Sequence, residues 1–221
     1  MDKLKVLFCG YREWANEATY VVMNHPWVAI NAQYIQSKEA FDKLMQESPN
    51  FDTIIFVGWS WIVPKSILDK YLCLCVHPSD LPAYRGGTPL QHQIIDGVKN
   101  TKVSLLKMTE KIDAGPIYCK EDLSLEGDLE TVLDNLKEAT IHLLMKYFLE
   151  SKDKPPVEQD NDLATTYKRR KPEQSEITAG DLEWATAEEI YNKIRALQYP
   201  YPNAYIVCGD GTKVYITKAH F

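Results

Sequence analysis

The sequence predicts a doubly wound, mostly parallel α/β sheet followed by a small helix and hairpin appendage. The main observation is a set of continuous apolar runs at 4–9, 53–57 and 72–76, each ended by a glycine or a polar residue. Such runs are typical of strands buried on both faces of a parallel sheet. Stretches with helical spacing separate the runs, and an alternation of strands and helices favours a doubly wound arrangement.

The remaining elements follow from local signals in the order of the chain. We expect helices at 13–24, 38–47, 64–71, 88–97, 129–151 and 187–197. A further short strand is expected to begin at 28–30, and four more strands are expected at 102–108, 116–125, 204–208 and 213–217. Pro64 and Pro89 suit first helical turns, and Thr88 suits an N-cap. Asp210-Gly211 between apolar runs indicates a hairpin. The charged segment 152–162 contains prolines, so we interpret it as a linker or mobile loop.

These elements divide the 221 residues into three parts. We expect an α/β domain at 1–151, a linker or loop at 152–180 and a helix-hairpin subdomain at 181–221. A two-stranded unit is barely stable alone. The protein is therefore expected to form a homodimer through the hairpin and the C-terminal helix.

Composition excludes several classes of protein. The net charge of −6 argues against a surface that binds nucleic acid over the whole molecule. No apolar run approaches the ~20 residues of a membrane helix, and the start at Met1–Lys5 has no signal-peptide pattern. The five cysteines are odd in number and lack a Cys-x-x-Cys pair, so we expect reduced thiols, a cytoplasmic protein and no metal site.

The most informative stretch is 77–89, which reads HPSDLPAYRGGTP. His77 follows an apolar strand and opens a loop with three prolines and two glycines. Asp113 lies further along the chain in a second constrained loop, 111–116. In open α/β sheets the ligand crevice lies beyond the carboxyl ends of the strands. A histidine and a carboxylate held there can move a proton, although Asp113 could instead cap a turn before Gly115.

These motifs resemble the formyltransferase family that uses 10-formyltetrahydrofolate. The resemblance is carried by 77–86, by Pro89-Leu90-Gln91, by 112–115 and by 194–205 (IRALQYPYPNAY), in this order. The family includes methionyl-tRNA, glycinamide ribonucleotide and sugar-nucleotide formyltransferases and domains of some peptide synthetases. The resemblance implies a Rossmann-like formyltransferase fold and 10-formyltetrahydrofolate as cofactor.

The resemblance also implies residue roles. His77 would act at the attacking amine or at the oxyanion, and Asp113 would orient His77 and could accept the amine proton through water. The candidate folate-binding residues are Trp59, Ser60, Trp61, Ile62, Leu81, Ile112 and Asp113. The candidate residues for the second substrate are Arg12, Ser79, Tyr84, Arg85, Gly86, Gly87, Lys168 and Arg169.

Cys75 departs from the family, most of whose members carry an asparagine two residues before the histidine. Losing an amide donor to an oxyanion can cost ~3–4 kcal/mol, and a thiol is a weaker donor. Three alternatives remain: imidazolium at His77 acts alone, Gln91 donates, or the backbone N–H groups of Gly86 and Gly87 donate. Cys75 itself is expected to be an inert thiol, since no activating charge is evident.

The substrate expected from the resemblance is an amino-sugar nucleotide. The chain ends soon after the hairpin and is acidic, which disfavours transfer RNA, and it lacks a Gly-rich phosphate loop after the first strand, which disfavours purine-pathway members. We expect N-formylation of a 4-amino-4,6-dideoxy sugar nucleotide of a pseudaminic-acid or O-antigen pathway. The alternatives are a carrier-bound amino acid as acceptor, or an inactive folate- or nucleotide-binding module. The basic cluster 168–171 is either a solvated linker or a diphosphate contact, with Tyr167 beside it as a base-stacking candidate.

Overall fold

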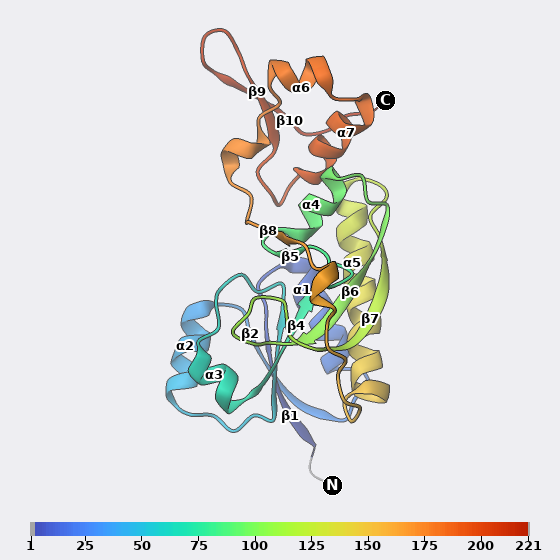
Figure 1. Ribbon diagram of the computed structural model, residues 1–221. Helices are drawn as coiled ribbons and strands as arrows, with labels where there is room; N and C mark the ends of the chain where they lie inside the picture. Colours follow the sequence, from blue (N-terminus) through green and yellow to red (C-terminus); the bar gives the residue numbers. More distant parts are fainter. Residues whose placement is uncertain (1–2, 221) are drawn as a thin grey trace.

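A six-stranded sheet of order β2-β1-β3-β4-β6-β7 forms the centre of the protein (Figure 1). The computed structural model describes residues 3–220, so residues 1, 2 and 221 of the predicted segments lie outside the described part. The strands are β1 (Leu4–Cys9), β2 (Ile30–Ile35), β3 (Thr53–Val57), β4 (Leu72–His77), β6 (Asn100–Lys107) and β7 (Ile117–Ser124). β1, β2, β3 and β4 pair in parallel, whereas β6 pairs antiparallel with both β4 and β7. The predicted mostly parallel α/β fold is confirmed.

Helices cover both faces of this sheet. They are α1 (Glu13–Met23), α2 (Lys38–Gln46), α3 (Lys65–Lys70), α4 (Pro89–Ile95) and α5 (Leu129–Lys146). In β1, Val6 and Phe8 belong to the apolar cluster shared with α1 and α5, while Leu7 and Cys9 belong to the cluster that contains Phe41 of α2. Successive side chains of a strand point to opposite faces. This two-sided burial explains why the strand sequences are apolar at every position.

Several local expectations need correction. α5 ends at Lys146 and continues as one π-helical turn, Tyr147–Ser151, instead of reaching residue 151 as an α-helix. β2 begins at Ile30, and α3 begins at Lys65 with Pro64 flanking it. Thr88 precedes α4 as expected, but its φ is +53° and its hydroxyl donates to the carbonyl oxygen of Gly87, so it caps no helical N–H. The Thr88 hydroxyl is used to hold the neighbouring loop instead.

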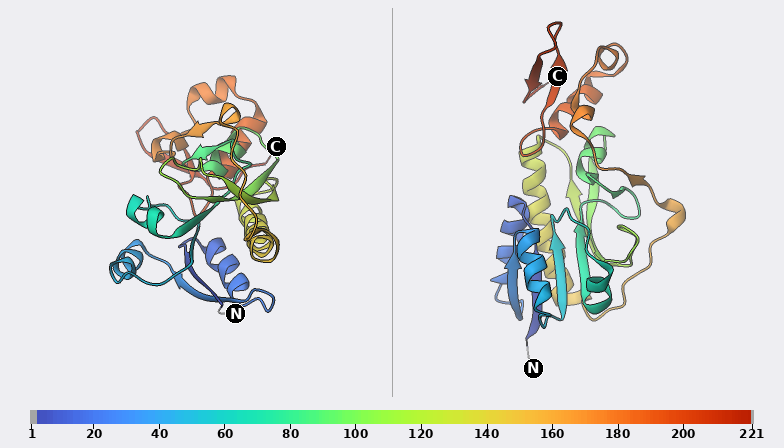
Figure 2. Two further views of the ribbon diagram at one scale, coloured as in Figure 1. Left: turned by 60° about the horizontal axis from the view of Figure 1, so that its bottom comes forward. Right: turned by 90° about the vertical axis from the view of Figure 1, so that its left-hand side faces the viewer.

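The segment at 152–162 is not a free linker. It runs along the side of the α/β domain from the end of α5 toward the C-terminal part of the chain (Figures 1 and 2). Val157 exchanges two backbone hydrogen bonds of 2.8 Å with Ile117, and β8 (Thr166–Tyr167) pairs in parallel with β5 (Arg85–Gly86). We name residues 157–170 the strap, because they cross the loop that follows His77. The strap thus lies beside the candidate catalytic residues, although it is not part of the central sheet.

The C-terminal part lies at the end of the molecule away from the N-terminus (Figure 1). It contains α6 (Ala179–Trp184), α7 (Ala187–Ala196) and the predicted hairpin of β9 (Ala204–Val207) and β10 (Lys213–Ile216). α7 packs against α4, and Ile194 and Ala204 belong to the same apolar cluster as the sheet. α6 was not expected from the sequence. The division at 152 and 181 and the homodimer stay predictions, and a monomer by light scattering would contradict the dimer.

Candidate active site

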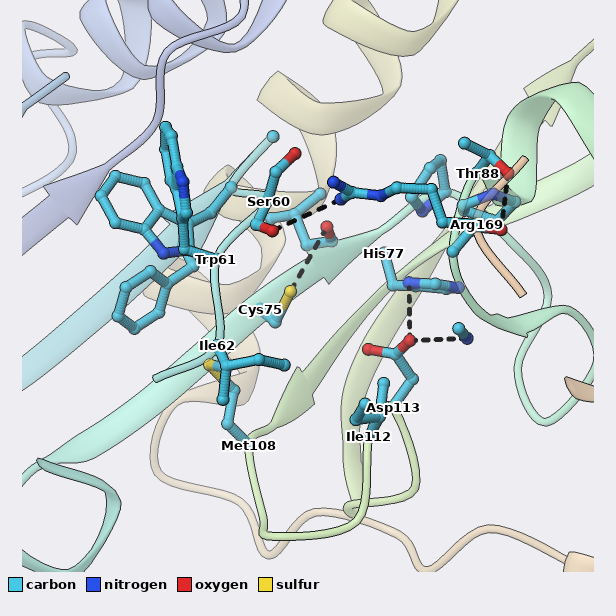
Figure 3. A pocket seen from close by; sticks show the side chains of 18 of the residues that line it. Ser60, Trp61, Ile62, Cys75, His77, Thr88, Met108, Ile112, Asp113 and Arg169 are labelled. Carbon is cyan, nitrogen blue, oxygen red and sulfur yellow. Dashed lines mark hydrogen bonds and ion pairs between the residues drawn. The ribbon is translucent and has the colours of Figure 1, made fainter. Parts of the chain in front are cut away.

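A cavity of about 920 Å³ opens at the carboxyl ends of β1, β3 and β4. Segments that follow three strands converge on it, with Arg12 after β1, residues 58–64 after β3 and His77 at the end of β4. The first turn of α4, the loop of Asp113 and the strap complete the wall (Figure 3). Because parallel strands end at one edge of a sheet, residues far apart in sequence meet here.

His77 and Asp113 come together in this cavity. Nδ1 of His77 lies 3.5 Å from Oδ2 of Asp113, and His77 is only 5% exposed. The other ring nitrogen, Nε2, lies 2.9 Å from the backbone carbonyl oxygen of Tyr84. A carbonyl oxygen only accepts, so Nε2 carries a proton and donates it. Both nitrogens of the ring therefore face oxygen acceptors.

Backbone contacts orient the Asp113 carboxylate. Asp113 has a φ of +52°, and its Oδ2 accepts a 2.8 Å hydrogen bond from the backbone N–H of Gly86. Figure 3 shows the second carboxylate oxygen on the side of the cavity that faces Cys75 and Ile62. One oxygen is therefore fixed by the loop of His77, and the other faces the cavity, where it can accept a proton.

Apolar side chains make one wall of the cavity. Trp59 and Trp61 pack with ring centroids 4.7 Å apart, and Trp61 packs against Tyr11 at 4.8 Å. Trp59 also contacts Phe41 and Phe56, so its ring is partly a core residue. The hydroxyls of Ser60 and Tyr11 lie 2.6 Å apart. Trp61 remains available to a ligand.

Two isoleucines complete the apolar wall. Ile62 and Ile112 line the cavity and are 76% and 60% exposed, respectively. Figure 3 shows them on segments from opposite sides of the opening, with Met108 beside Ile62. Exposed apolar side chains around a cavity offer surface to a flat, largely apolar ligand.

Basic side chains line another part of the cavity. Arg12, Lys168, Arg169 and Arg170 all line it, and within residues 3–220 none of the four forms an ion pair. Arg169 donates to the carbonyl oxygen of Ser60 at 3.3 Å, and Nε of Arg170 is buried without a hydrogen-bond partner. Burial lowers the pKa of Arg170. Unpaired arginines beside a cavity suit an anionic ligand.

Four predicted contact residues do not line this cavity. Ser79 is buried and donates to the carbonyl oxygen of Ala83, and Leu81 is buried inside the loop. The ring of Tyr84 stacks on Tyr167 at 4.9 Å, and its hydroxyl donates to Asp96. These three side chains hold the loop in shape, which corrects their assignment to ligand contact.

Arg85 is the fourth correction. Its guanidinium is buried and donates from Nε and Nη2 to Oε1 of Gln159 and from Nη1 to Oδ1 of Asn161. With these N–H groups occupied by the strap, Arg85 joins two segments of the protein instead of meeting a substrate. Sequence reasoning missed Gln159, because it lies in a polar segment that has no core-like pattern.

Cys75 stands at the position where most members of the family carry an asparagine, and its surroundings show whether the thiol can replace the amide. Burial, with a smaller contribution from Asp113, raises the pKa of the Cys75 thiol, and its Sγ lies 3.7 Å from the carbonyl oxygen of Val76. The thiol is therefore neutral and donates weakly. The N–H groups of Gly86 and Gly87 already donate to Asp113 and to the Tyr167 carbonyl oxygen.

Gln91 differs from these donors. It lines the cavity and is 3% exposed, and its Nε2 has no hydrogen-bond partner within residues 3–220. A buried amide N–H that is left unpaired costs about 1–3 kcal/mol. Gln91 thus carries an unpaired amide N–H in the wall of the cavity, and an acceptor that reached this group would recover the cost.

Residues 3–220 contain no group of three His, Cys, Asp or Glu side chains placed to hold a metal ion. No helix in this range combines the length and apolar character needed to cross a bilayer. All five cysteines are free thiols.

Alanine in place of Gly86 is expected to destabilise the protein by about 1–3 kcal/mol. Gly86 has a φ of +96°, and an added Cβ would collide with the Tyr167 carbonyl oxygen of the strap. Gly211 is the matched control, since it also has a positive φ but has open space around it. Urea unfolding should show a larger loss for Gly86→Ala than for Gly211→Ala. If the two variants lose the same free energy of unfolding, the contact with the strap contributes nothing beyond the strain of a positive φ.

Two family models match the sequence. The model described as formyl transferase matches residues 7–148, and the model described as formyl transferase, C-terminal domain, matches residues 175–221. The chain belongs to the formyl transferase family. The resemblance seen in the motifs is therefore confirmed at the level of the family.

Among curated proteins, the chain is 36% identical over 189 residues to a methionyl-tRNA formyltransferase of Bacillus cytotoxicus. This match covers 82% of the chain but only 58% of the relative. Among solved structures, a methionyl-tRNA formyltransferase from Clostridium thermocellum is 32% identical, with a TM-score of 0.79 and coverage of 96% and 97% of the two chains. A 4-N formyltransferase from Francisella tularensis shares the fold at 18% identity and a TM-score of 0.78, over 97% of this chain and 96% of that one.

Proposed function

We propose that this protein is an N-formyltransferase that transfers the formyl group of 10-formyltetrahydrofolate to the amine of an amino-sugar nucleotide, specifically a 4-amino-4,6-dideoxy sugar. The observation that supports this proposal best is the His77–Asp113 pair, which lies in one cavity between exposed apolar side chains and unpaired arginines. The apolar wall suits a pterin, and the arginines suit a diphosphate. Membership of the family supports the reaction class.

The residues divide the work of the reaction between them. Bound 10-formyltetrahydrofolate would supply the formyl group, whose bond to N10 is exchanged for a bond to the acceptor nitrogen. Asp113 presents one oxygen to the cavity and takes the proton that the acceptor amine loses. The His77 ring stabilises negative charge on the formyl oxygen, and the proton that Asp113 took passes to N10 as the bond between N10 and the formyl carbon breaks. Holding both substrates together supplies much of the remaining acceleration.

The sugar-nucleotide assignment rests on charge. The chain as a whole is acidic, with a net charge of −6, yet four basic side chains that form no ion pair within residues 3–220 line this one cavity. Such a local positive charge favours an anionic ligand. Arg169 and Arg170 each donate from Nη2 to a backbone carbonyl oxygen, of Ser60 and Gln174 respectively, and their remaining N–H groups suit phosphate oxygens, as does the guanidinium of Arg12. Tyr167 also lines the cavity, but its ring packs against Tyr84 and His92, so the proposal assigns it no contact with the base. The diphosphate of a sugar nucleotide carries the oxygens that these cations suit.

Methionyl-tRNA is the second candidate acceptor. The observation in its favour is the 36% identity to a methionyl-tRNA formyltransferase of Bacillus cytotoxicus. Transfer RNA also carries phosphates that arginine could bind. The acidic net charge weighs against it, because long-range repulsion would oppose binding of a polyanion.

The test supplies 10-formyltetrahydrofolate with UDP-, dTDP- and GDP-linked 4-amino sugars, methionyl-tRNA and an aminoacylated carrier protein, and measures release of tetrahydrofolate. Turnover with one nucleotide sugar is the expected result. Turnover with methionyl-tRNA or with the carrier alone would contradict the sugar assignment. Folate binding without turnover of any acceptor would identify an inactive binding module.

Alanine in place of Arg169 is expected to raise KM for the nucleotide sugar by about 10-fold or more, since a hydrogen bond to a charged group contributes about 1.5–3 kcal/mol. The unphosphorylated sugar should be affected little, because it has no diphosphate. Lys171 belongs to the same basic cluster but does not line the cavity, so Lys171→Ala is the control. An unchanged KM in Arg169→Ala would remove Arg169 from the substrate site.

A further inference from the structure

Gln159 lies in the strap and contacts both loops that carry the candidate catalytic pair. Its side chain is 8% exposed. Nε2 donates to the backbone carbonyl oxygens of Asp113 at 2.8 Å and of Gly115 at 2.7 Å. Oε1 accepts from Nε of Arg85 at 3.1 Å and from Nη2 at 2.8 Å. Both protons of the amide nitrogen and both lone pairs of the oxygen are therefore used.

Both ends of this amide lead to the His77–Asp113 pair. On one side, Gln159 holds the carbonyl oxygen of Asp113, a residue with a φ of +52° that is held in an unusual backbone conformation. On the other side it holds Arg85. Arg85 lies between Tyr84, whose carbonyl oxygen accepts from the ring of His77, and Gly86, whose N–H donates to Asp113. One side chain thus connects the supports of the imidazole and of the carboxylate.

Anchoring of the strap does not require Gln159. Val157 pairs with Ile117, and the N–H of Thr165 donates to the carbonyl oxygen of Pro82. The backbone N–H groups of Arg85 and Gly87 donate to carbonyl oxygens of the strap. These hydrogen bonds attach the strap on either side of Gln159. What Gln159 adds is the connection to the loop of Asp113.

We propose that Gln159 is a positioning residue, which sets the placement of Asp113 relative to His77 from outside the sheet. The proposal rests on the catalytic roles assigned to these two residues under the proposed function. A displacement of about 1 Å at a catalytic group can cost about 10²-fold in rate. Loss of the Gln159 contacts should therefore lower kcat and leave substrate affinity unchanged.

Gln159→Glu is the sharpest variant. The carboxylate keeps the shape of the side chain and still accepts from Arg85, but it has no N–H to donate to the Asp113 and Gly115 carbonyl oxygens. We expect kcat to fall by about 10²-fold, with KM for both substrates near its native value and a lower melting temperature, because two carbonyl oxygens lose their donor. Gln159→Met, which adds no charge, provides the same measurements if Gln159→Glu does not fold.

A spectroscopic measurement separates positioning from general damage. The ¹⁵N signals of the His77 ring report its hydrogen bonds and protonation, and they should move in the Gln159 variants. Asn161→Ala is the matched control, since it removes one partner of Arg85 and contacts neither Asp113 nor Gly115. It should retain native kcat and native ring signals.

Three outcomes overturn the proposal. They are native kcat in the Gln159 variants, a fall in kcat without movement of the His77 signals, and an equal fall in Asn161→Ala. Asp113→Asn tests the underlying function separately. If Asp113→Asn keeps native turnover, the assigned catalytic pair is wrong, whereas a loss in Asp113→Asn with native Gln159 variants refutes only the positioning role.

Discussion

Alanine in place of His77 is expected to lower kcat by about 10²–10⁴-fold, the range in which a positioned acid or base contributes to catalysis. The imidazole is nearly buried at the end of β4, and both ring nitrogens contact acceptors. Its Nδ1 faces the Asp113 carboxylate at 3.5 Å. Removing the ring leaves the charge on the formyl oxygen without this stabilisation, and steady-state release of tetrahydrofolate measures the loss.

Asp113→Asn should lower kcat by a similar factor, for a different reason. An amide accepts no proton from the acceptor amine, and it no longer supplies the negative charge opposite the His77 ring. His142→Ala is the control for both variants, because His142 is exposed on α5, away from the cavity. Native kcat in either His77→Ala or Asp113→Asn would mean that the pair is structural only.

Leucine in place of Gln91 is expected to lower kcat by about 10²–10³-fold, as removal of an oxyanion donor does. Of the three donors left open by the absence of the asparagine, the N–H groups of Gly86 and Gly87 are already occupied. Nε2 of Gln91 is unpaired and buried in the wall of the cavity. We therefore expect this amide, among the three donors, to engage the formyl oxygen.

Two further measurements sharpen the Gln91 test. Gln91→Leu should be at least as stable as the native protein by urea unfolding, because it removes an unpaired buried polar group. Adding Cys75→Asn should restore part of the lost activity, since it returns an amide to the position that carries asparagine in most of the family. Native kcat in Gln91→Leu, or a loss of activity explained by lower stability, would refute the donor role.

The sequence was sufficient to predict the sheet where burial is two-sided. The runs at 4–9, 53–57 and 72–76 are apolar at almost every position because helices cover both faces of β1, β3 and β4. β2 was harder, since it lies at the edge of the sheet and alternates exposed and half-buried residues. The short β5–β8 pair carries no periodic signal at all.

The candidate site was predictable where it depends on strand ends. His77 is the last residue of β4 and Asp113 lies in the loop after β6, and the fold brings these two places together. Arg85 was assigned wrongly, because a sequence does not show whether a guanidinium faces a ligand or its own chain. Gln159 was missed for the same reason, as two of its partners are backbone carbonyl oxygens. Polar residues buried by hydrogen bonds leave no hydrophobic pattern.

The most direct test of the account follows an isotopically labelled formyl group. The native protein is mixed with labelled 10-formyltetrahydrofolate and the nucleotide sugar that it turns over, and the label is traced by mass spectrometry. The account predicts that the label appears as a new amide on the sugar amine, and that it does not do so with His77→Ala. Label released only as formate, or retained on the folate in the presence of every acceptor, would contradict transfer to an amine.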